Sequence, residues 1–200
     1  MVAADPSLNY DAAAQVAHSI STHAVQTEYD YFTAVDDLSP DDSSGAGHLG
    51  TVEYDAATLY RYATVNLAEL EKHLGDKMPE AAEGFVKAFI CSMPTGKQNT
   101  FANRTLPDAV YVTLRNDQPV NMSGAFERPV TSNGDGYVSI SKKRFCEYAS
   151  MLYSTFTEPP AYSFAIGEGM ESLAQCGSLS DMIRWLDELI GNTQKGGEQA

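Results

Sequence analysis

The sequence predicts a mixed α+β domain with antiparallel strand pairing. Stretches with the two-residue period of a β-strand and stretches with the helical period both occur along its 200 residues. Hydrophobic residues make up 43% of the chain and charged residues 20%, which fits a folded domain and excludes disorder or a coiled coil. No run approaches the ~18 apolar residues that a membrane span needs. We therefore expect one domain over residues 1–200.

The strands are expected first. Residues 11–23 alternate in a way that favours a strand, although their alanines also allow a helix. Residues 29–38 are aromatic and β-branched and predict a second strand, and the Gly- and Ser-rich residues 39–50 predict a loop or hairpin tip. Residues 51–67 predict one long strand, one face of which carries Leu59, Arg61, Ala63, Val65 and Leu67.

Three helices and one more strand are expected in the remainder. Residues 78–92 have helical period with a proline in the first turn, and residues 109–115 alternate as a strand does. Residues 139–156 predict a second helix and residues 179–190 a third, followed by a frayed tail over 192–200. The expected caps are Ser139 or Ser141 for the second helix and Ser178 or Ser180 for the third, which Gly191 ends.

The charge argues against a free-standing nucleic-acid binder. Thirteen lysines and arginines against 27 acidic residues give a net charge of −14, and the first cation along the chain is Arg61. Phosphate contacts normally need Lys, Arg or a backbone N–H. If the first 60 residues contact nucleic acid, we expect them to do so by shape, backbone or apolar insertion, with cations supplied by another protein.

No motif predicts catalysis, a metal or a cofactor. The three cysteines are widely spaced, which excludes a disulfide framework and a CxxC zinc site and makes a reducing cytosol the default. The histidines do not stand at metal-ligand spacing, and no HExxH or GxSxG occurs. Gly96-Lys97 lacks the upstream glycine of a phosphate-binding loop. A non-enzymatic protein without a cofactor is expected.

Four longer motifs carry a family resemblance. They are HSISTHAVQTEYDYFTAVDDL at 18–38, GAGHLGTVEYDAATLYRYATVNLAEL at 45–70, KQNTFANRTLPDAVYVTLRND at 97–117 and PVNMSGAFERPV at 119–130. The chain resembles the backbone subunit of the type I-E CRISPR surveillance complex Cascade, the CasC family. That resemblance implies a hand-like protein with an RRM-like palm, a helical fingers region and a thumb hairpin. It also implies that, as in that family, several copies stack along the CRISPR RNA and each thumb displaces a nucleotide from guide–target pairing.

The resemblance also implies site residues. The thumb falls on residues 30–50, within a hairpin insertion over 28–52, and the family's wedge positions fall on Thr33 and Leu49. His48 and Phe32 accompany them as RNA-binding or docking residues of the thumb. A tip residue such as Leu49 can also pack on its own hairpin, and Phe32 can be thumb-base packing.

Three further residues are candidates for contact with the guide. Tyr60 and Arg61 have the chemistry to stack on bases, although a palm strand directs at least one of Tyr60 and Tyr62 into the core. His23, at the foot of the thumb, is compatible with a hinge hydrogen bond or with an RNA contact.

The chain differs from members of that family in length. Family members are much longer, so the sequence predicts a truncated palm without the first palm strand, the basic guide-gripping segment and the fingers. One hypothesis is a homologue that engages type I-E Cascade subunits and interferes with them, an anti-CRISPR by mimicry. The alternatives are a working backbone component and an inactive remnant. The expected partners are Cascade subunits, CRISPR RNA only within a complex, and a second copy of the chain, without a membrane.

Overall fold

The centre of the molecule is a three-stranded sheet. The computed structural model describes residues 11–34 and 48–197. In the sheet, β7 (Val110–Leu114) pairs antiparallel with β8 (Tyr162–Ile166), and β8 pairs parallel with the short β9 (Gln175–Cys176). Every other described strand pair is antiparallel, so the α+β prediction is confirmed, with this parallel pair as the exception.

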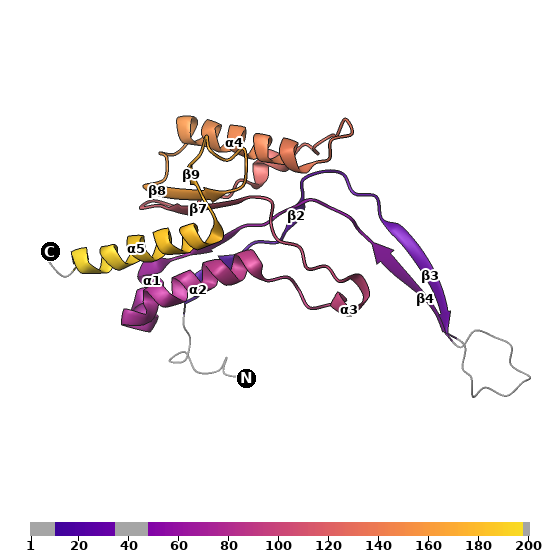
Figure 1. Ribbon diagram of the computed structural model, residues 1–200, viewed down its shortest axis with the longest axis horizontal. Helices are drawn as coiled ribbons and strands as arrows, with labels where there is room; N and C mark the ends of the chain where they lie inside the picture. The colour runs from indigo at the N-terminus through magenta and orange to yellow at the C-terminus, as the bar shows by residue number, and fades with distance from the viewer. Residues whose placement is uncertain (1–10, 35–47, 198–200) are drawn as a thin grey trace, which may run out of the picture.

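Helices cover both faces of this sheet (Figure 1). Helix α4 (Val138–Thr155) lies on one face, where Cys146 packs with Ala165 and Met170. Helices α2 (Met78–Cys91) and α5 (Leu179–Gly197) lie on the other, where Ile90 and Met182 pack on Phe164. Because successive strand residues point to opposite faces, neighbouring Phe164 and Ala165 serve the two different cores.

Helix α1 (Leu67–Leu74) and the 3₁₀ turn η2 (Gly75–Lys77) precede α2 and complete the helical layer. A third apolar cluster joins Met78 and Ala82 of α2 to Leu186 and Ile190 of α5, with α1 packed against it. Among the described residues, no helix combines the length and the apolar character that crossing a bilayer requires.

A broken antiparallel ladder leads from the body toward a projecting hairpin. Strand β1 (Ala14–Val16) pairs with β6 (Ala63–Val65), and β2 (Ile20–Ser21) pairs with β5 (Leu59–Tyr60). The prediction of one strand over 51–67 is therefore wrong. That stretch contains three separate strands, and Leu67 begins α1, because Asn66 caps the helix by accepting a hydrogen bond from the backbone N–H of Glu69 at 3.1 Å.

The hairpin of β3 (Glu28–Ala34) and β4 (His48–Tyr54) extends away from the layered body (Figure 1). Its register pairs seven residues on each strand, from Glu28 opposite Tyr54 to Ala34 opposite His48. The expected thumb hairpin is thus present. The expected loop over 39–50 is too long at its end, because His48–Gly50 are already paired in β4; residues 35–47 lie outside the described residues.

The helix predictions are confirmed with corrections at the ends. Ser178 caps α5 as expected, since its hydroxyl accepts from the N–H of Asp181 at 3.2 Å and the Asp181 carboxylate accepts from the Ser178 N–H at 3.0 Å. Gly191 does not end α5, which continues to Gly197. Neither serine caps α4: Ser139 lies inside the helix, and buried Ser141 donates from its hydroxyl to Thr22 Oγ1 at 2.9 Å.

The strands β8 and β9, the short helix α3 (Gln98–Phe101) and the 3₁₀ turn η3 (Ser123–Phe126) were not predicted from the sequence. Within residues 122–126, Ser123–Phe126 form η3, in which Phe126 is buried.

Candidate nucleic-acid interface

The projecting hairpin presents exposed aromatic side chains. Tyr29 and Tyr31 alternate along β3 and are 58% and 71% exposed, and Thr33 follows them at the same spacing. Residues two apart on a strand share a face, so these three line one side of the ribbon. Their register partners on β4 are Glu53, Thr51 and Leu49. An exposed aromatic ribbon outside any core is typical of a surface that a partner covers.

Thr33 and Leu49, the two expected wedge positions, are brought opposite one another by this register. They form the last pair but one of the described hairpin, next to Ala34 and His48. The hairpin therefore places three of the predicted thumb residues together at its outer end.

Phe32, the fourth predicted thumb residue, pairs with Gly50. A Cβ at Gly50 would overlap the Phe32 ring, so the absence of a side chain at Gly50 is what lets the ring lie across β4. Phe32 remains 44% exposed. It thus packs on its own hairpin and still faces the outside.

His23 lies at the joint between hairpin and body. Its Nε2 accepts a hydrogen bond from the N–H of Thr58 at 3.0 Å, which leaves the proton on Nδ1, and Nδ1 donates to the carbonyl of Ala24 at 2.8 Å. The ring stacks on Tyr137 with centroids 3.7 Å apart. The side chain is 9% exposed. Both ring nitrogens therefore have protein partners, and the hydrogen bonds expected of a hinge residue are present at His23.

Backbone contacts with Val130 also stabilise this joint. The N–H of Val130 donates to the carbonyl of Thr22 at 2.8 Å, and Val130 forms an isolated parallel bridge with His23. The two strands of the hairpin leave the body here, so this network sets the direction of the ribbon.

Tyr60 points into the body. Its hydroxyl donates to Asn121 Oδ1 at 3.0 Å and accepts from the N–H of Met122 at 3.0 Å, while its ring packs near Phe126 and Phe145. Burial raises the pKa of Tyr60 to about 12. The side chain links the ladder to η3, and its ring lies tilted against the rings of Phe126 and Phe145.

Arg61, in contrast, is exposed. Its guanidinium carbon lies 4.5 Å from the centre of the Phe89 ring, and Nη1 donates to the carbonyl of Ser92 at 3.4 Å. The structure therefore separates the three expected guide-contact residues. His23 and Tyr60 form hydrogen bonds within the protein, whereas Arg61 lies on the surface at the end of α2.

Sequence reasoning missed the segment that follows. Residues 92–108, which we call the α3 arm, run from the end of α2 through α3 toward the base of the hairpin (Figure 1). Phe101 of this arm meets Tyr54 of β4 edge to face at a centroid distance of 5.1 Å. The signal in the sequence is the pair of cations Lys97 and Arg104 on either side of Phe101, within the third family motif.

The α3 arm is held in an unusual conformation. Lys97 and Ala102, which flank α3, have positive φ angles of 59° and 50°. Each non-glycine residue in the left-handed region costs about 1 kcal/mol or more. In addition, the buried Oδ1 of Asn103 accepts no hydrogen bond from the residues that the structure describes. Strain and an unsatisfied acceptor within one short segment are typical of functional loops.

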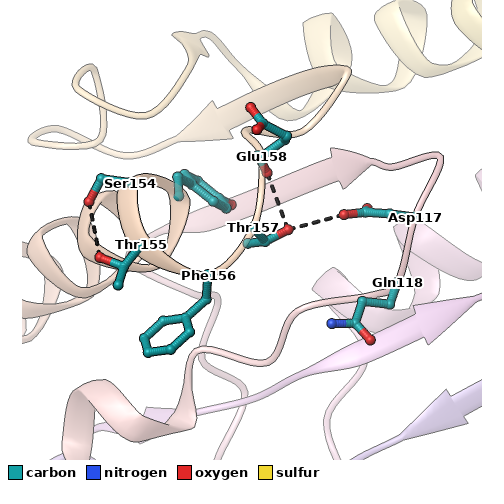
Figure 2. A pocket seen from close by; sticks show the side chains of 8 residues that line it. Asp117, Gln118, Ser154, Thr155, Phe156, Thr157 and Glu158 are labelled. Atoms are coloured by element: carbon teal, nitrogen blue, oxygen red, sulfur yellow. Dashed lines mark hydrogen bonds between the residues drawn. The ribbon is translucent and has the colours of Figure 1, made fainter.

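A hollow of about 560 Å³ lies at the C-terminal end of α4. It is lined by residues 117–118 and 153–158 (Figure 2). Arg115 bonds to three of the lining residues. Its side chain is only 6% exposed and donates to Asp117 at 2.8 Å, to Thr157 Oγ1 at 2.6 Å and to the carbonyl of Glu158 at 2.8 Å. Hydrogen bonding from Arg115 lowers the pKa of the Asp117 carboxyl.

These contacts join the end of β7 to the end of α4, and the figure shows Thr157 bridging Asp117 and Glu158 (Figure 2). The arrangement is a structural clamp, and it contains no nucleophile–base pair. Within the described residues, no group of three His, Cys, Asp or Glu side chains is placed to hold a metal ion.

The architecture defines a class before any comparison: a layered α+β domain that carries a long β-ribbon outside its core. The chain matches the CT1975-like protein family over residues 1–191 and belongs to that family. No curated protein matches it.

Solved structures give a more specific likeness. A chain of a "CRISPR RNA-guided surveillance complex, pre-nicking" is 32% identical with a TM-score of 0.81, over 94% of this chain and 53% of that one. A chain of a "CRISPR RNA-guided surveillance complex" is also 32% identical, with a TM-score of 0.82, over 95% of this chain and 75% of that one. This chain thus spans about half the length of the first of these relatives, and it is a homologue of CRISPR surveillance-complex subunits.

Proposed function

We propose that this chain is a backbone-type subunit of a CRISPR RNA-guided surveillance complex of type I-E, and that its β3–β4 hairpin lies against the guide–target duplex. The observation that carries the proposal is the hairpin itself. It is a ribbon outside the core, with Thr33 opposite Leu49 at its outer end and exposed tyrosines along β3. The likeness to chains of surveillance complexes supports the same assignment.

The role proposed for the hairpin is mechanical. Apolar or small side chains that enter between base steps unstack them at a cost of a few kcal/mol per step, which protein contacts offset. Such insertion needs no cation on the hairpin. This agrees with a sequence in which the first lysine or arginine is Arg61. The phosphates are then neutralised elsewhere in the assembly.

The test is co-expression of the tagged chain with the remaining subunits of a type I-E system and a CRISPR array. We expect recovery of the assembled subunits together with guide RNA in fixed stoichiometry, measured by native mass spectrometry and RNA sequencing. Assembled protein without RNA contradicts the proposal.

A second function is favoured by one observation, the net charge of −14. In this second function, the chain docks on Cascade subunits without binding the guide RNA. It thereby interferes with their assembly, which is anti-CRISPR activity by mimicry. The same co-expression separates the two functions. Interference predicts recovery of a subset of subunits without guide RNA and a loss of plasmid targeting in cells, whereas a working subunit restores targeting in a strain that lacks its own backbone protein.

A further inference from the structure

We infer that the α3 arm and the base of the hairpin form a second contact surface, which holds the phosphodiester backbone of a single nucleic-acid strand. The inference rests on the proposed function and extends it beyond the thumb. It assigns Lys97 and Arg104 to phosphate contact and Phe101 to base or sugar packing.

The cations of the arm are available for such a contact. Lys97 and Arg104 are exposed, and neither forms an ion pair with any residue that the structure describes. Arg104 donates to the neutral Oε1 of Gln98 at 3.0 Å, so its position is fixed without loss of its charge. In a chain with a net charge of −14, two such cations seven positions apart along the sequence are notable.

Aromatic rings alternate with these cations. The Lys97 ammonium lies 5.5 Å from the centre of the Phe101 ring, and Phe101 in turn contacts Tyr54. Arg61 lies over Phe89 at the other end of the arm. Phe101 and Tyr54 keep 37% and 39% of their surface exposed. Cations interleaved with accessible aromatic rings are what proteins use to hold single strands, since every base has a face on which to stack.

The arm is also placed and preorganised for this task. The Phe101–Tyr54 contact fixes it at the base of β4, so a strand that passes the hairpin passes the arm. The positive φ angles at Lys97 and Ala102 hold α3 between two sharp changes of chain direction. A surface that is already ordered loses less conformational entropy when it binds.

The test is the double charge reversal K97E/R104E, made in the full chain and assembled with its subunits and guide as above. For two phosphate contacts to a single strand, the slope of log K against log salt becomes shallower by about 1.4, and affinity falls at least tenfold at moderate salt. Two measurements identify the strand. One is the retention of guide RNA by the complex over a salt series, and the other is the binding of complementary single-stranded DNA to the loaded complex, followed by fluorescence anisotropy.

The matched control is K77E/R184E, which makes the same charge change on η2 and α5. Weaker binding in either measurement for K97E/R104E, without a change for the control, supports the inference. The measurement that changes identifies the strand as the guide or the target. Equal behaviour of the two variants, with normal assembly, overturns it. Loss of subunit assembly with unchanged nucleic-acid affinity also overturns it and assigns the arm to a protein partner. Wild-type complex without RNA overturns the proposed function, and the inference with it.

Discussion

Thr33 and Leu49 stand directly opposite one another near the outer end of the β3–β4 hairpin, although fifteen intervening residues separate them in the sequence. The pairing register alone brings them together. A register shift of one residue would break this pair and turn every side chain of the strand to the other face. A wedge made of these two residues therefore depends on the register of the whole ribbon.

The double substitution T33A/L49A is expected to leave assembly and guide retention unchanged and to weaken binding of the complementary strand by about tenfold, or ~1.4 kcal/mol. The reason is that the proposed function places the outer end of the hairpin against the target, whereas the apolar clusters of the described residues lie in the layered body. Target affinity of the loaded complex, measured by anisotropy, checks this. T51A, closer to the base of the same hairpin, is the control and should behave as wild type.

H23F is expected to destabilise the domain by about 1–3 kcal/mol, because the Thr58 N–H and the Ala24 carbonyl lose their partner while the ring stack on Tyr137 is kept. Urea unfolding gives the change in free energy. Hydrogen exchange should also accelerate in β3 and β4 more than in α2. Unchanged exchange in the hairpin, combined with weaker RNA binding, would instead make His23 a guide contact.

R115A is expected to cost about 3 kcal/mol of unfolding free energy, since it removes a buried guanidinium that bonds to Asp117, Thr157 and Glu158 together. Thermal and urea unfolding measure this. The control is R184A, which removes an exposed ion pair with Asp181 and should cost less than ~1 kcal/mol. Similar losses for both variants would show that the clamp contributes little.

The pKa of Tyr60 gives a pH dependence with a definite sign. The folded pKa of about 12 lies above the unfolded value of 10, so the folded state favours the neutral phenol. The corresponding stability is fully present below pH 10 and is lost as the pH rises toward 12. Burial also raises the pKa values of Tyr62 and Tyr111, which adds to the same trend.

Y60F should therefore lose less stability than wild type between pH 10 and 12. At neutral pH it should be less stable by about 1–2 kcal/mol, because Asn121 and the Met122 N–H lose a partner. Alkaline unfolding followed by circular dichroism distinguishes the two proteins. Wild-type stability of Y60F combined with weakened RNA binding would instead indicate that Tyr60 contacts the guide RNA.

The sequence was sufficient for elements whose period is clear. The helix at Met78–Cys91 and the strand at Val110–Leu114 have one apolar pattern each and no competing one. The stretch 51–67 misled because Tyr, Val, Thr and Leu favour strands throughout it, and the divisions come from long-range partners such as His23, which receives the Thr58 N–H. Asn66 and Glu69 were the local sign of a helix start within that stretch.

The candidate site was predictable only in part. The hairpin and its outer residues follow from the motif resemblance, and the register then pairs Thr33 with Leu49. The roles of His23 and Tyr60 could not be decided from the sequence, because a histidine or tyrosine on a strand serves the core or a ligand equally well. Their hydrogen-bond partners come from residues up to 62 positions away. No hydrophobic periodicity in the sequence predicts the α3 arm, and its positive φ angles are visible only in the structure.

The isolation of the β3–β4 ribbon has a consequence for evolution. An isolated two-stranded hairpin is at best marginally stable by itself, so we expect the three apolar clusters of the body, rather than the outer end of the hairpin, to supply the folding stability. Substitutions at that end are then nearly neutral for folding. We therefore expect sequence change to concentrate in the outer hairpin, while the sequence of the body stays constrained by packing in its three apolar clusters.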